Sequence, residues 1–139
     1  MKKNTNCMQT IYACFIGYIV QAIVNNFVPL LFVTFQNNYH ISLERITFLI
    51  TLNFIIQLFV DLLSAFFIDR IGYRISILIA HILSAAGLIL LTVLPEVFFS
   101  PYTGLVIAVI IYAIGGGLLE VLVSPIIEAC PTDNKEKAM

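Results

Sequence analysis

Three ionisable residues, Asp61, His81 and Glu120, lie within long apolar stretches of the 139-residue sequence. An ionised side chain at the centre of a bilayer costs at least ~2.5 kcal/mol on insertion scales, so it requires a partner, a hydrated cavity or a function. Carboxyl and imidazole groups can take up and release protons. We therefore predict proton coupling at these three residues, and contacts between packed helices are the alternative for each of them.

Asp61 and His81 fall at the same expected depth in two consecutive apolar stretches. Asp61 lies eight residues before the charged Asp69, or ~12 Å along a helix, and His81 lies a similar distance into the following stretch. Asn53 and Gln57 precede Asp61 at four-residue spacing, which places all three on one helix face. We predict a hydrogen-bonded or ionic pair between Asp61 and His81. The alternative is a packing pair with no role in transport.

Glu120 lies near the middle of its apolar stretch, eleven residues before Pro131, and that stretch contains no Lys or Arg. A carboxyl group without a cation in its own helix suits a site that exchanges protons. The alternative is a neutral glutamic acid that only bonds a neighbouring helix.

Amide side chains in the first apolar stretch could bind a polar solute. Gln21 and Asn25 are four residues apart and share a helix face, Asn26 follows directly, and Gln21 lies at a depth similar to that of Glu120. Amides offer both donors and acceptors, as a polyhydroxyl solute such as a sugar requires. We predict substrate binding by Gln21, Asn25, Asn26 and Glu120; the alternative is amide bonding between helices.

The elements that position these residues must be membrane-spanning helices. With 60% apolar residues, 11% charged residues and a mean hydropathy of +1.02, the chain has too few charges for a soluble surface. A hydrocarbon core of ~30 Å requires ~20 helical residues, and lipid offers no partner to open backbone groups. We predict an all-α membrane fold with four transmembrane helices over residues 11–35, 46–68, 75–94 and 104–127.

The segments QNNYHIS, DRIGYR and PEVFFSP separate these stretches, and their turn-forming and charged residues predict loops. Short loops rich in Lys and Arg remain in the cytoplasm. Six of the seven cations fall on one side if both termini are cytoplasmic, whereas Arg45 is outside; the six are Lys2, Lys3, Arg70, Arg74, Lys135 and Lys137. We predict a multi-pass protein of the plasma membrane with cytoplasmic N- and C-termini.

The sequence contains no motif for metal binding, nucleic-acid binding or enzymatic catalysis. Cys7, Cys14 and Cys130 form no CxxC or Cys/His cluster, so the sequence predicts no metal site, cofactor or disulfide framework. A net charge of −1 gives no reason to expect nucleic acid as a partner. No nucleophile, base and orienting residue are arranged together, so we predict that the protein is not an enzyme.

The segment AFFIDRIGYR, residues 65–74, resembles the cytoplasmic loop between helices two and three of the major facilitator superfamily. The family pattern there is G-x-L-a-D-R-x-G-R-R/K. Four key positions match it, namely Asp69, Arg70, Gly72 and Arg74. The resemblance implies that these four residues form a gating loop.

Within the superfamily, GGGLLEVLVSP, residues 115–125, and the Asn25–Asn26 pair followed by Pro29 resemble fucose-permease-like sugar symporters. In those relatives a carboxylate at the position of Glu120 is linked to proton coupling. The first-helix acid of some relatives is Asn25 here. Proton antiporters of the superfamily carry an arginine on helix four. This chain has Ile111 at about that position, which argues against drug/proton antiport.

The resemblance covers nearly the whole chain but only the first third of a twelve-helix transporter. It implies that residues 1–139 are a partial N-terminal transmembrane domain of a truncated transporter, completed by missing C-terminal helices. The implied function is secondary active transport of a small polar, sugar-like solute by alternating access. Its partners would be membrane lipid, the solute, and protons or another coupling ion. Two alternatives are a complete four-helix homo-oligomeric proton-coupled transporter and a membrane scaffold subunit that transports nothing.

Overall fold

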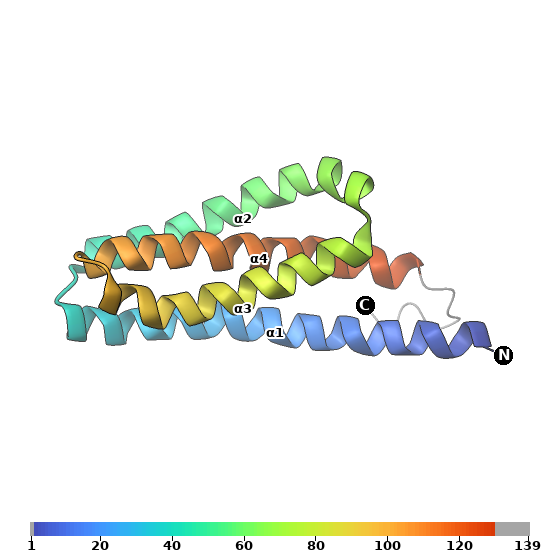
Figure 1. The fold of residues 1–139 in the computed structure, drawn as a ribbon, viewed down its shortest axis with the longest axis horizontal. Helices are drawn as coiled ribbons and strands as arrows, with labels where there is room; N and C mark the ends of the chain where they lie inside the picture. Colours follow the sequence, from blue (N-terminus) through green and yellow to red (C-terminus); the bar gives the residue numbers. More distant parts are fainter. Residues whose placement is uncertain (1, 130–139) are drawn as a thin grey trace.

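The computed structural model describes residues 2–129, without the side chains of residues 2–7, 27, 65, 69 and 129. Four helices follow one another along the chain: α1 Lys2–Tyr39, α2 Leu43–Ile71, α3 Tyr73–Val97 and α4 Pro101–Ala129. Consecutive helices run in opposite directions, so α2 and α4 are parallel (Figure 1). The fold is all-α over the described residues, as the apolar pattern predicts.

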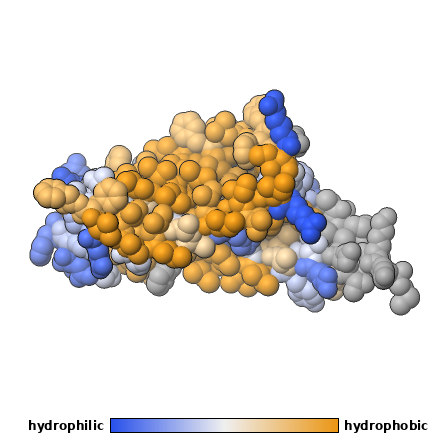
Figure 2. All heavy atoms as spheres, viewed as in Figure 1, coloured by the Kyte–Doolittle hydropathy of each residue, from blue (hydrophilic) through white to orange (hydrophobic). Residues whose placement is uncertain are grey.

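All four helices are long and apolar enough to cross a membrane, and the chain is a multi-pass membrane protein. The candidate spans are Met8–Tyr39, Leu43–Ser64, Tyr73–Val97 and Pro101–Glu128. Figure 2 shows the consequence at the surface: apolar residues cover the middle of the bundle, and hydrophilic residues gather toward its two ends. Exposed Phe, Leu and Ile side chains on the outside of α2 therefore face lipid.

The predicted loops are mostly helical. In the structure, the helices are joined by residues 40–42, by Gly72 alone and by residues 98–100, so each connection has three residues or fewer. Polar residues such as Gln36 and Arg70 continue their helices beyond the apolar stretch. A polar side chain marks where the hydrocarbon ends, but it does not stop the backbone hydrogen bonding of a helix.

Gly72 makes the α2–α3 connection possible in a single residue. Its φ of 88° and ψ of 149° define a backbone conformation that side chains with a Cβ rarely adopt. Its N–H donates to the Ile68 carbonyl at 2.8 Å, and its own carbonyl accepts from the Ser76 hydroxyl at 3.0 Å. The glycine thus ends α2 and starts α3 with its hydrogen bonds satisfied.

Helix α4 is the centre of the bundle. Of an apolar 18-residue segment of its span, 61% is buried inside the structure, against 29% or less for the corresponding segments of the other spans. It lies between α2 and α3 (Figure 1) and contacts all three other helices. The α3–α4 contact is the most extensive because glycines allow the backbones to meet. A Cβ on Gly87 would lie 2.4 Å from the Tyr112 Cβ, and one on Gly115 would lie 2.5 Å from the Ser84 nitrogen.

One contact fixes the helix ends opposite the α2–α3 turn. The guanidinium of Arg45, in the first turn of α2, lies 5.1 Å from the ring centroid of Tyr102 at the start of α4. A cation over an aromatic face is attracted by the ring quadrupole. The single arginine expected outside the cytoplasm therefore helps to join α2 to α4.

Candidate functional site

Polar side chains from α1, α2 and α4 meet inside the membrane-spanning part of the bundle. We call them the amide–carboxylate cluster, which consists of Gln21, Asn25, Asn53, Gln57 and Glu120. Every span is otherwise mainly apolar, so this cluster is the candidate site for binding a polar solute.

Gln21 and Glu120 join α1 to α4. The Gln21 Nε2 donates to Glu120 Oε2 at 2.9 Å. Gln21 is only 6% exposed, whereas Glu120 is exposed. An ionised carboxylate can only accept hydrogen bonds, so the Gln21 amide must point its NH₂ group at it. The two residues share a depth, as expected from their distances to the helix ends.

Gln57 joins α2 to α1. Its Nε2 donates to Asn25 Oδ1 at 3.0 Å and to Asn53 Oδ1, one turn earlier on α2, at 3.4 Å. Gln57 and Asn53 are 6% and 7% exposed, respectively, so both amides are removed from solvent. The first amide pair links two helices, and it connects a predicted substrate-binding residue to a side chain that was not predicted to belong to the site.

Glycines on α4 let this polar face of α2 approach closely. A Cβ on Gly116 would lie 3.4 Å from the Gln57 Nε2, and one on Gly117 would lie 3.2 Å from the Val60 Cβ. These contacts set the register between the parallel helices α2 and α4. One helical turn further along each helix, Asp61 and Glu120 come to the same level.

Asp61 has a buried oxygen without a partner. Among the described residues, its Oδ1 is inaccessible to solvent and accepts no hydrogen bond. Asp61 is also close enough to Glu120 for the two charges to interact. Two carboxyl groups that face each other in a medium of low polarity repel when both are ionised.

The predicted Asp61–His81 pair is not formed. The His81 Nδ1 bonds the Ile77 carbonyl of its own helix at 2.8 Å. Its ring lies near Gly17 of α1, and it lines a hollow that also includes Ala13. Equal depth does not specify how each helix is rotated about its axis. Helix α4 lies between α2 and α3, and the His81 ring lies near Gly17 of α1.

Asn26 does not join the other predicted substrate-binding residues. Its Nδ2 donates to the Ala22 carbonyl one turn earlier, and it lines a shallow apolar hollow on the outer side of α1. A second α1–α4 hydrogen bond was not predicted, between the hydroxyl groups of Tyr18 and Ser124 at 2.9 Å. Tyr18 precedes Gln21 by three residues, and that helical spacing is the sequence signal for it.

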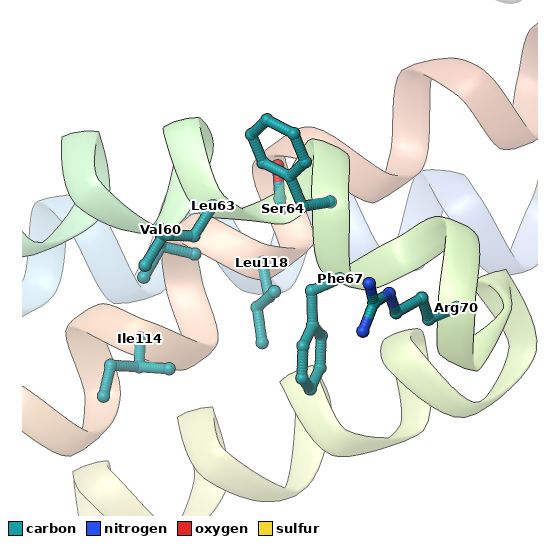
Figure 3. A pocket seen from close by; sticks show the side chains of 8 residues that line it. Val60, Leu63, Ser64, Phe67, Arg70, Ile114 and Leu118 are labelled. Atoms are coloured by element: carbon teal, nitrogen blue, oxygen red, sulfur yellow. The ribbon is translucent and has the colours of Figure 1, made fainter.

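Two of the predicted gating residues, Arg70 and Arg74, flank the α2–α3 turn and are exposed. Arg70 lies at the mouth of an apolar groove of about 450 Å³ between α2 and α4, beside Phe67 and Leu118 (Figure 3). Arg74 lines two separate hollows between α1 and α3. The side chain of Asp69 lies outside the described residues.

No group of three or more His, Cys, Asp or Glu side chains capable of holding a metal ion occurs in the part of the chain that the structure describes. The amides of the amide–carboxylate cluster can donate and accept hydrogen bonds, and the carboxyl group of Glu120 can exchange a proton.

A comparison of the sequence with known families finds a match. The sequence model of the Major Facilitator Superfamily matches residues 14–139, which is most of the chain. No curated protein and no solved structure matches the chain significantly. Members of the superfamily move solutes across membranes. This match over most of the chain, together with four helices long and apolar enough to cross a membrane, establishes that the chain belongs to the major facilitator superfamily.

Proposed function

We propose that the protein takes part in secondary active transport of a small, neutral, sugar-like solute by alternating access, with proton coupling at Glu120. The observation that carries this proposal is the Gln21–Glu120 hydrogen bond, a donor and an acceptor fixed side by side at membrane depth. Glu120 is not covered by the other three helices, and in the proposed mechanism its open side faces the solute path. Hydroxyl groups both donate and accept, which suits a mixed pair of this kind.

Proton coupling follows from what protonation does to this hydrogen bond. As a carboxylate, Glu120 accepts from the Gln21 Nε2. As a carboxylic acid, it also donates through its own O–H. A proton therefore changes which partners the pair offers to a solute. Asp61, at the same level on α2, is the second candidate for this exchange, and His81 is a more distant one on α3.

The α2–α3 turn would supply the gate. Asp69, Arg70, Gly72 and Arg74 lie at or next to this turn, and the two arginines are exposed there. In the proposed gate, an ion pair between Asp69 and one of these arginines would break and re-form as the helices tilt. We place this end, with both termini, on the cytoplasmic side of the plasma membrane, because it collects most of the Lys and Arg residues.

Equilibrium binding and uptake test the proposal. The purified chain, reconstituted in liposomes, is offered radiolabelled neutral hexoses, polyols, amino acids and organic cations at several pH values. We expect binding of hexoses or polyols that strengthens or weakens with pH, and loss of that pH dependence in Glu120→Gln. Thr51→Val is the matched control, because the Thr51 hydroxyl is exposed and bonds only its own helix.

Preference for organic cations or amino acids would overturn the sugar-like assignment. Binding that is identical in Glu120→Gln at every pH would overturn the coupling assignment.

A further inference from the structure

We propose that Gln57 is a positioning residue that sets solute specificity: it turns Asn25 so that the Asn25 amino group, and not its carbonyl, faces the solute. This inference rests on the proposed function, since it assumes that Asn25 contacts the solute. It concerns a residue that neither the sequence pattern nor the family match places in the site.

Gln57 is held in one place from three sides. It is 6% exposed, it bonds Asn25 on α1 and Asn53 on its own helix, and its Nε2 lies 3.4 Å from where a Cβ of Gly116 on α4 would be. A buried amide with partners on two sides and backbone on the third has little rotational freedom.

The direction of the Gln57 hydrogen bonds decides what Asn25 offers. Gln57 Nε2 carries two hydrogens, and the two oxygens that receive them are Asn25 Oδ1 and Asn53 Oδ1. The Asn25 carbonyl is therefore turned toward Gln57. Its Nδ2 makes no hydrogen bond with any residue that the structure describes, so the free end of Asn25 is a pure donor.

Glu120 supplies the complementary group. Its Oε2 accepts from Gln21, and its Oε1 has no hydrogen-bond partner among residues 2–129. The cluster thus presents one donor, from Asn25, and one acceptor, from Glu120. A solute must accept at the first point and donate at the second, which hydroxyl groups do. A protonated amine at the first point cannot accept and is rejected.

The sharpest variant is Gln57→Glu, which has the same length but only acceptors. Asn25 must then turn its NH₂ group toward position 57 and offer its carbonyl to the solute. The preference for a hydroxyl over an amino group at that position should fall at least fivefold, the factor associated with one neutral hydrogen bond.

A negative charge would by itself attract an amine, so a charge-matched control is required. Asn53→Asp adds the same charge one turn away, next to the same amide, without contacting Asn25. Specificity should change less in Asn53→Asp than in Gln57→Glu. Equal changes in both would overturn the positioning role and leave a purely electrostatic effect.

Two further variants distinguish a change in specificity from a folding defect caused by the substitution. Gln57→Met keeps the volume without adding charge and should lower the same preference about threefold or more. In an Asn25→Ala background, Gln57→Met should have no further effect, because Gln57 acts through Asn25. A Gln57→Met effect that persists without Asn25 would overturn the inference.

The measurement is equilibrium dialysis of the reconstituted full chain against pairs of radiolabelled hexoses and the corresponding aminodeoxyhexoses. Wild-type protein that binds no hexose would defeat the proposed function itself. Wild-type protein that binds hexoses, with a hydroxyl-to-amino ratio unchanged in Gln57→Glu and Gln57→Met, would defeat only the role of Gln57.

Discussion

Gln21 and Glu120 lie 99 positions apart in the sequence, yet their side chains are joined by a hydrogen bond of 2.9 Å across the α1–α4 interface. The donor is buried and the acceptor is exposed, so the bond leads from the packed interior to the open face of the bundle. The Gln21 amide therefore stabilises a charge on Glu120 through one of the two carboxylate oxygens, Oε2.

Glu120→Gln should abolish the pH dependence of solute binding while keeping the affinity within about tenfold of the wild type. An amide has the shape of the carboxyl group and still bonds Gln21, but it cannot exchange a proton. Binding isotherms measured at several pH values check the prediction. A pH profile that survives the substitution would show that another group titrates.

Asp61→Asn should raise the thermal midpoint of the protein in detergent. The Asp61 Oδ1 is buried without a partner and its charge opposes that of Glu120, and a neutral amide removes that repulsion. Glu44→Gln is the control, because Glu44 is an exposed carboxylate in the first turn of α2. A lower midpoint for Asp61→Asn than for wild type would contradict the assignment of Asp61 as an unpartnered acid.

Gly115→Ala and Gly116→Ala should differ sharply although the two glycines are adjacent. A Cβ at 115 would lie 2.5 Å from the Ser84 backbone nitrogen, and the helices must separate to admit it. We expect a loss of about 1–3 kcal/mol of stability, as for overpacked cores. At 116 the nearest atom is the Gln57 amide at 3.4 Å, and little stability should be lost. Unfolding in mixed detergent measures both.

Gly72→Ala should cost about 1–3 kcal/mol through backbone strain alone. Its φ of 88° is unfavourable for any residue with a Cβ, although nothing lies within 4 Å of the added atom. Gly17→Ala is the control within α1, where the nearest contact would be an ordinary 3.7 Å to Val123. That substitution should be neutral or stabilising, because alanine favours helix. Equal stability of both variants would argue against strain at the turn.

The apolar pattern of the sequence predicts the four long helices. It does not predict how each helix is rotated about its own axis, and this rotation decides which side chains meet. Hydropathy and length specify which residues cross the membrane, so the four helices contain every predicted span. The helix ends were misjudged, because polar residues such as Gln36 remain helical beyond the hydrocarbon.

The Asp61–His81 pair failed for a different reason. Depth can be counted along one helix, but contact depends on which helix lies between two others. The spacing of residues on α2 and α3 does not predict that α4 packs between these two helices. The Gln57–Asn25 bond was missed for the same reason, although the four-residue spacing of Asn53, Gln57 and Asp61 had marked the correct face of α2.

The glycine-lined contact between α3 and α4 also has a mechanical consequence. With Gly87 against Tyr112 and Gly115 against Ser84, main chain meets main chain, and no flexible side chain is left to absorb a shift. Helices α3 and α4 should consequently move together as one rigid body. The interfaces that α1 and α2 make with the rest of the bundle are less extensive and include side-chain hydrogen bonds, which can break and re-form. Any relative movement of the helices should therefore occur at these interfaces.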